Sequence, residues 1–165
     1  MAEDQVPSGK KFVIRPRDQS LTKNLGERTK DIGSLEMLKG PEPIWVLSTG
    51  DEGRAPKEAW ERVQDALGSD IVADPAFIDQ EGNALYPTGL ITIRFAHEPT
   101  EADLERFARE HDLEVYSRNK FVPSQVTFAP AKPTASFLPD LVAQVKSAPE
   151  VKSAWADTVS KFIRR

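Results

Sequence analysis

Residues 90–95 read Leu-Ile-Thr-Ile-Arg-Phe, and this stretch decides the fold class. Apolar and polar side chains alternate along it, and several are β-branched or aromatic, so it predicts a strand with one buried face. After the break at Pro99, residues 101–111 carry apolar side chains at helical spacing. Thr100 and Asp103 resemble the residues that cap a helix N-terminus. Residues 90–111 therefore predict a strand followed by an amphipathic helix.

Residues 113–156 predict three more strands and a second helix. Residues 113–116 and 125–128 each predict a short strand, and residues 151–155 predict a last one. Between them lies a second helix, which we expect Ser136 to cap and whose apolar face consists of Leu138, Leu141, Val142 and Val145. The order β-α-β-β-α-β predicts an α+β fold of the ferredoxin-like type, an antiparallel sheet with two helices on one face.

The first half of the chain is harder to interpret. Residues 1–11 are polar and predict a flexible terminus, residues 12–14 suit an edge strand, and residues 19–40 are charged and predict one short helix near their end. Residues 44–78 predict a strand, a helix and a strand. We therefore expect a smaller α/β module before the ferredoxin-like one.

The domain boundaries predicted from these patterns divide the chain into four parts. They are a flexible N-terminus at 1–11, an N-terminal α/β module at 12–80, a ferredoxin-like module at 81–157 and a C-terminal tail at 158–165. At 165 residues the chain is long enough to form such a pair of modules around apolar cores.

The composition removes several classes of function. The chain has no cysteine, two histidines and a net charge of −4. It therefore has no disulfide scaffold or thiolate chemistry, and its acidity disfavours nucleic acid as a partner. We expect no cofactor, no metal and no membrane span, since no apolar run approaches the about 20 residues that a span needs. The polar first residues lack the features of a signal peptide, which predicts a cytoplasmic location.

Several strings resemble one protein family. Residues 79–83 (Asp-Gln-Glu-Gly-Asn), 86–89 (Tyr-Pro-Thr-Gly) and 91–95 (Ile-Thr-Ile-Arg-Phe) resemble the start of the propeptide of bacterial subtilisin-like serine proteases, the peptidase S8 family. Residues 148–151 (Ala-Pro-Glu-Val) stand where such propeptides often have Asp-Pro-x-Val before their last strand. The resemblance covers about residues 76–161 and implies the same βαββαβ fold.

The chain departs from the family pattern at two places. Residues 154–157 (Ala-Trp-Ala-Asp) stand where the family often has Ala-Glu-Pro-Asn or Ala-Glu-Pro-Asp. Residues 1–70 match no part of such a propeptide. They leave three alternatives open: a second module, an extension of the sheet or an addition that binds a partner.

The resemblance implies a folding chaperone and inhibitor of a subtilisin-like catalytic domain, acting in cis or in trans. The sheet would dock on the protease, with Trp155, Arg118 and Lys120 as a possible docking surface, although Trp155 suits the edge of the core equally well. The tail would enter the substrate cleft as an added strand. Cleavage after Arg165 would put Phe162 in the fourth pocket before the scissile bond, followed by Ile163, Arg164 and Arg165.

The chain itself lacks the sequence motifs around the Asp, His and Ser of such a protease. For example, Asp157-Thr158 is followed by Val159 and not by glycine. We therefore expect a protein that is not an enzyme. The alternative is a stand-alone, non-catalytic protein–protein interaction module with the same fold.

Overall fold

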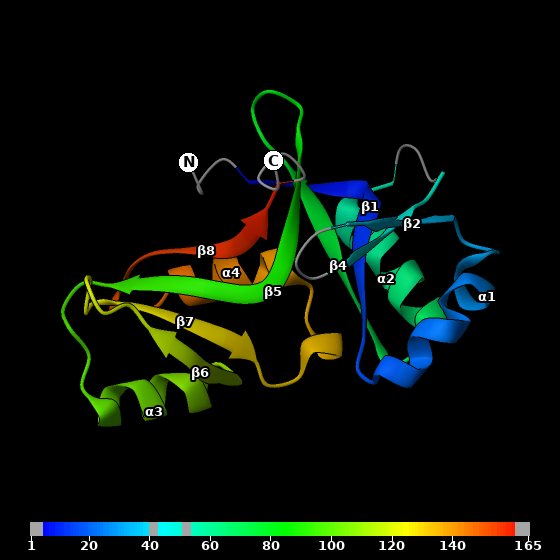
Figure 1. Ribbon diagram of the computed structural model, residues 1–165. Helices are drawn as coiled ribbons and strands as arrows, with labels where there is room; N and C mark the ends of the chain where they lie inside the picture. The colour runs from blue at the N-terminus through cyan, green and yellow to red at the C-terminus, as the bar shows by residue number, and fades with distance from the viewer. Residues whose placement is uncertain (1–4, 40–42, 51–53, 161–165) are drawn as a thin grey trace. The chain divides into compact units, whose positions relative to one another are not determined.

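The computed structural model describes residues 5–39, 43–50 and 54–160, and this part of the chain is α+β, with eight strands and four α-helices (Figure 1). Contacts divide the chain into a C-terminal unit around Thr88–Asp157 and an N-terminal unit formed by Asp4–Pro87 together with Thr158–Arg165. Hydrogen-bonded strands follow the order β2-β3-β1-β4-β5-β7-β6, and β8 also pairs with β5. The unit boundary after Pro87 lies seven residues beyond the predicted boundary at residue 80.

The C-terminal unit has the predicted βαββαβ order. Its elements are β5 (Ala84–Phe95), α3 (Glu101–Glu110), β6 (Leu113–Arg118), β7 (Gln125–Pro130), a 3-10 turn (Pro133–Ala135), α4 (Leu138–Lys146) and β8 (Val151–Val159). The strands lie in the order β8-β5-β7-β6, and β5 runs antiparallel to β7. Both helices lie on one side of this sheet (Figure 1). The ferredoxin-like prediction is confirmed.

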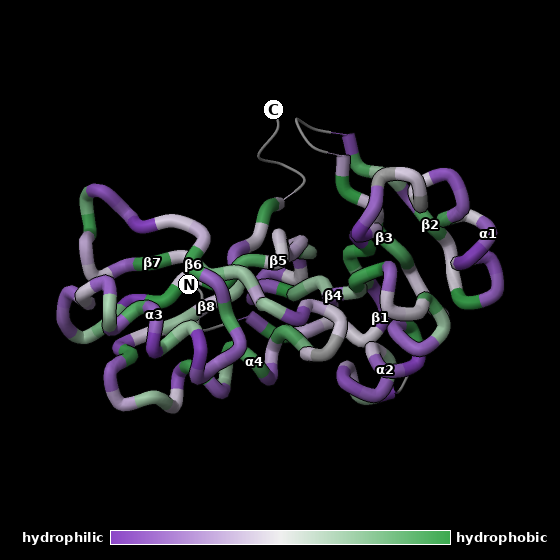
Figure 2. Tube along the Cα trace, turned by 90° about the horizontal axis from the view of Figure 1, so that it is seen from below, coloured by the Kyte–Doolittle hydropathy of each residue, from purple (hydrophilic) through white to green (hydrophobic). Residues whose placement is uncertain are grey.

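Three aromatic rings form the centre of this unit. Phe107 from α3 lies 5.1 Å from Phe95 and 5.6 Å from Phe128, measured between ring centroids, and all three residues are buried. Most residues of α3 are hydrophilic (Figure 2), as expected for a helix with a single apolar stripe. The alternation predicted for residues 90–95 thus places Ile91, Ile93 and Phe95 on the helix side of the sheet.

Two helix starts in this unit differ in how they are capped. At α3 the Thr100 hydroxyl accepts a hydrogen bond from the Asp103 N–H, and the Asp103 carboxylate accepts one from the Thr100 N–H, as predicted. That backbone hydrogen bond, with help from the Thr100 hydroxyl, lowers the pKa of Asp103. At α4 the prediction is wrong: the cap is Phe137 and not Ser136. Pro139 in the first turn lacks an N–H, so a hydroxyl cap has one fewer donor to satisfy.

The N-terminal unit has the same topology as the C-terminal unit. Its elements are β1 (Val6–Pro16), a 3-10 turn (Gln19–Asn24), α1 (Leu25–Thr29), β2 (Ser34–Leu38), β3 (Ile44–Ser48), α2 (Pro56–Leu67) and β4 (Ile71–Ile78). The strand order β2-β3-β1-β4 corresponds, strand for strand, to β6-β7-β5-β8. Of the three alternatives left open for residues 1–70, the structure gives a second module, with the element order βαββαβ.

Sequence patterns missed two parts of this module. β1 begins at Val6, so residues 6–11 are strand rather than terminus, and residues 34–38 form β2 rather than a helix. Both errors have the same cause. These residues form strands because their backbones pair with neighbouring strands, while their side chains carry no pattern typical of a strand. Val6 and Pro7 pair with Ile78 and Phe77, and every residue of β2 pairs with β3 across a hairpin.

The outer edge of β4 is closed by two side chains of α2. The Gln64 amide accepts a hydrogen bond from the Ala73 N–H at 2.9 Å and donates to the Ile71 carbonyl at 2.7 Å. The Trp60 indole N–H donates to the Ala73 carbonyl, also at 2.7 Å. A strand edge left open would attract another strand. Trp60 is therefore a core residue that also covers an edge.

Gly33, just before β2, lies where no side chain fits. A Cβ at this position would stand 2.2 Å from the Ser48 carbonyl oxygen. Gly33→Ala must therefore push β2 away from β3, and we expect the free energy of unfolding to fall by about 2 kcal/mol, the cost of an overpacked site. Gly26→Ala in α1 is the control, because nothing lies within 4 Å and alanine favours a helix. Chemical denaturation of both variants measures the difference. A Gly33→Ala variant as stable as the wild type would contradict this expectation.

Candidate docking surfaces

The C-terminal unit has one sheet face without helices, which we call the open face. Alternation along the strands assigns to it the residues opposite the buried apolar ones. Its members are Thr92, Arg94, Gln125, Thr127, Trp155 and Asp157. Polar groups thus predominate here, whereas the helix side of the same strands is apolar.

Hydrogen bonds between strands fix the side chains at the middle of the open face. The Thr92 hydroxyl donates to the Asp157 carboxylate and lies 3.2 Å from the Thr127 hydroxyl, so three strands are linked through one side chain. Thr92 is buried, and a buried polar group that kept no partner would be costly. The side chains at the centre of this face are therefore linked to one another across three strands.

A second pair lies at the end of the same face. Arg94 donates to the Gln125 side-chain oxygen at 2.9 Å, directly across β5 and β7. The Arg94 Nε is buried and has no hydrogen-bond partner among the described residues. Such a face offers hydrogen-bonding groups that are held by contacts between strands.

The residues predicted as a docking surface do not share one face. Trp155 lies on the open face and is half-buried, between the buried Ala154 and Ala156. Arg118 pairs with Val126 across β6 and β7 and so lies on the helix side. There its guanidinium donates to the Pro99 carbonyl at 3.1 Å and lies 3.6 Å from the Glu101 carboxylate. Lys120 is exposed in the following turn.

The predicted cleft residues Phe162, Ile163, Arg164 and Arg165 lie outside the described residues. The last described residue, Ser160, follows directly from β8.

The hairpin between β6 and β7 carries exposed aromatic residues that the sequence patterns did not single out. Tyr116 is 65% exposed beside a register shift in β6, and Phe121 is 93% exposed. The Asn119 side chain accepts hydrogen bonds from the Phe121 and Val122 N–H groups, which shapes the turn. An exposed aromatic on a fixed turn is the kind of residue that anchors protein interfaces.

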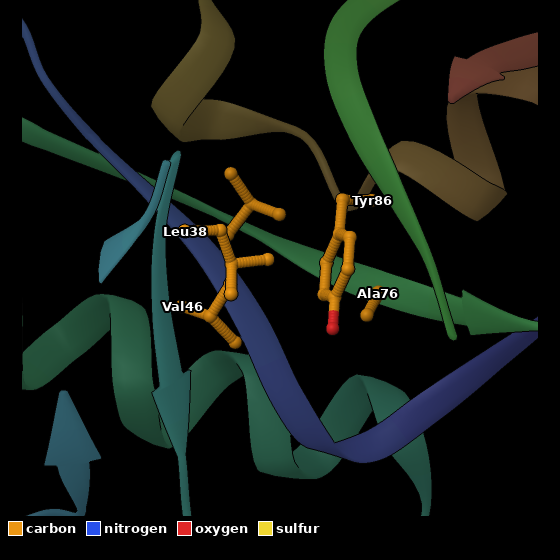
Figure 3. Packing of buried hydrophobic residues seen from close by; sticks show 5 residues of the cluster. Leu38, Val46, Ala76 and Tyr86 are labelled. Carbon is orange, nitrogen blue, oxygen red and sulfur yellow. The ribbon is translucent and has the colours of Figure 1, made fainter. Parts of the chain in front are cut away.

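The corresponding sheet face of the N-terminal unit is apolar and covered. Val13, Leu38, Val46, Ala76 and Tyr86 form a buried cluster, which we call the second-face cluster. Figure 3 shows the Tyr86 ring, from the start of β5, lying over Ala76 and beside Leu38 and Val46. Burial raises the pKa of Tyr86, and the nearby Glu36 carboxylate raises it further. Ile44, Ala84 and Val159 pack against the rim of the cluster.

An ion pair lies on the same covered face. Asp74 on β4 is opposite Val13, and only 6% of its side chain is exposed. The Arg15 guanidinium binds its carboxylate and also donates to the Pro87 carbonyl at 3.4 Å. The two units therefore share a topology but differ in this face, which is polar in the C-terminal unit and, apart from this ion pair, apolar and covered in the N-terminal unit.

No protein-family model matches the chain, and none of the curated proteins compared with it matches either. Across residues 5–39, 43–50 and 54–160 there is no group of three or more His, Cys, Asp or Glu residues placed to hold a metal ion. Within the same residues, no helix has the length and apolar character needed to cross a membrane.

Proposed function

We propose that the chain is a propeptide-like chaperone and inhibitor of a subtilisin-like serine protease. The open face of the C-terminal unit docks on the catalytic domain, and residues 162–165 enter the substrate cleft as an added strand. The observation that carries the proposal is the order β8-β5-β7-β6, with both helices on one side and a polar face on the other. It supports the resemblance found in residues 76–161.

Such a module would help its partner to fold, because the protease domain folds slowly on its own. A protease domain built on a parallel sheet has many non-local contacts and folds slowly. A preformed sheet that binds only the folded domain stabilises it by mass action. Thr92, Thr127 and Asp157 are already held in place, so little side-chain entropy is lost when the open face is covered. A cytoplasmic location belongs to the same proposal.

A second candidate is a stand-alone interaction module that binds another class of protein. The exposed Tyr116 and Phe121 favour it, because two exposed aromatic side chains on the β6–β7 hairpin suit a protein interface. A partner bound there would contact the hairpin, and inhibition of a protease would not follow.

The test is to mix the chain with a panel of subtilisin-like proteases and to follow hydrolysis of a peptide substrate. We expect competitive inhibition of at least one member, and a complex on size-exclusion chromatography. A chymotrypsin-like protease, which has the same catalytic groups on another fold, serves as the control and is not inhibited. Absence of both inhibition and complex across the panel would favour the interaction module.

A charged substitution on the open face locates the docking surface. Thr127→Lys places a long side chain in the middle of this face, and we expect the inhibition constant to rise at least tenfold because the charge must be buried. Ala102→Lys, on the exposed side of α3, adds the same charge elsewhere and leaves the inhibition constant within twofold. Circular dichroism checks that both variants are folded.

A further inference from the structure

Strand β6 forms one edge of the C-terminal sheet (Figure 1). It pairs with β7 on one side, and among the residues that the structure describes no strand pairs with its other side. The Ala131 N–H donates to the Asp112 carbonyl, so the ladder begins with a hydrogen-bonded pair. Bonded and non-bonded pairs alternate in an antiparallel ladder, so Glu114 bonds to β7, whereas Val115 directs its N–H and C=O away from β7. The outer edge of β6 therefore presents backbone groups with which a further strand can pair.

The side chains of β6 leave this edge accessible. Four consecutive side chains are exposed, namely Glu114, Val115, Tyr116 and Ser117. Many edge strands are guarded by a charged residue, and β2, the edge strand of the N-terminal unit, has the exposed Glu36 at its centre. The centre of β6 is instead the pair Val115 and Tyr116, which are 44% and 65% exposed. The register shift beside Tyr116 limits the length of any added ladder, so pairing here is expected to be weak.

The charges around β6 are separated between its two ends. Carboxylates precede the apolar centre and cations follow it; they are Glu110, Asp112 and Glu114, and then Arg118 and Lys120. If two copies of β6 pair in antiparallel orientation, the acidic start of each strand lies beside the basic end of the other, and the two apolar centres meet. Parallel pairing would bring like charges together. The charge pattern therefore fits a second copy of this chain.

We infer that β6 is a self-association edge, through which two copies of the chain pair in antiparallel orientation. Each copy contributes the same strand, so the dimer is symmetric about a twofold axis and closes at two copies. The inference goes beyond the proposed function and does not depend on it, because strand addition uses the edge of the C-terminal sheet and leaves its open face uncovered.

The first test measures the association and locates it in the same chain. Sedimentation equilibrium of the full chain should give a monomer–dimer equilibrium with a dissociation constant on the order of 10–100 μM, as suits an interface of one short strand. By hydrogen exchange, the Val115 amide should exchange at least threefold more slowly at about 1 mM than at about 10 μM chain, because dimer predominates only at the higher concentration. The Glu114 amide, which already bonds to β7, is the internal control and should change by less than twofold.

Three results of this test would overturn the inference. A chain that is still a monomer at about 1 mM does not use β6 for self-association. A dimer whose Val115 amide exchanges as fast as that of the monomer associates through another surface. A series of species larger than a dimer means that β6 pairs with a different edge of the next copy.

The second test changes the centre of the edge. Tyr116→Lys places two like charges near the twofold axis, and we expect the dissociation constant to rise at least tenfold. Tyr116→Phe keeps an aromatic side chain and should stay within threefold of the wild type. Ala102→Lys adds the same charge on the exposed side of α3 and should stay within twofold. Circular dichroism checks that the variants are folded. Equal dissociation constants for Tyr116→Lys and the wild type would contradict pairing through β6.

Discussion

Replacing Phe107 by alanine is expected to lower the free energy of unfolding by about 3–5 kcal/mol, the range for removing a buried aromatic side chain. Phe107 is 1% exposed and contacts the rings of Phe95, Phe128 and His111, so three side chains lose a partner at once. Denaturant unfolding followed by circular dichroism measures the loss.

The same substitution at Phe121 is the matched control for this prediction. Phe121 is 93% exposed, so Phe121→Ala should change the free energy of unfolding by less than about 0.5 kcal/mol. Similar losses of stability in the two variants would contradict the position of Phe107 at the centre of the C-terminal unit.

The second large effect is expected in the N-terminal unit, at the Arg15–Asp74 ion pair. Arg15→Met leaves the Asp74 carboxylate buried without a counter-charge. Breaking a buried pair by removing one partner costs about 3–5 kcal/mol, and since 31% of the Arg15 side chain is exposed we expect the lower end of that range. Thermal and denaturant unfolding should both show the change.

Two further variants show whether the stability lost in Arg15→Met is due to the buried charge of Asp74 or to another cause. The double variant Arg15→Met with Asp74→Leu removes both charges, and it should recover most of the lost stability. Lys30→Met breaks an exposed pair with Glu27 in the same unit and should change stability by less than about 0.5 kcal/mol. A double variant as unstable as Arg15→Met would mean that packing of the arginine stem, and not the charge, stabilises the unit.

The C-terminal unit is readable from its sequence because local signals there agree with the tertiary structure. Residues 90–95 alternate, and the Thr100–Asp103 pair caps a helix as predicted. Each of these signals depends on residues close together in the chain. Such signals are the ones that a single sequence carries most clearly.

The N-terminal unit is less readable because its strands are defined by their partners. Residues 6–11 are polar, yet they lie in β1, and residues 34–38 form a strand only because β3 pairs with them. Val13 and Ile14 are both buried because both faces of β1 are covered, which removes the alternation that would identify a strand with one exposed face. The repeated topology could not be recognised before these strands were known.

The docking surface was only partly predictable for a similar reason. Trp155 on the open face could be placed by its alternation with Ala154 and Ala156. The position of Arg118 could not, because the register shift between Val115 and Ser117 decides which side of β6 it occupies. A bulge of this kind changes the face of every later residue and leaves no clear mark in the sequence.

The most direct test of the proposed function is the inhibition constant of two chains against one responsive subtilisin-like protease. One is the full chain, and the other lacks Phe162, Ile163, Arg164 and Arg165. If the open face docks and these residues enter the cleft, the shortened chain should still bind, while its inhibition constant rises at least a hundredfold. An unchanged inhibition constant would contradict the account, because inhibition would then not depend on a strand placed in the cleft.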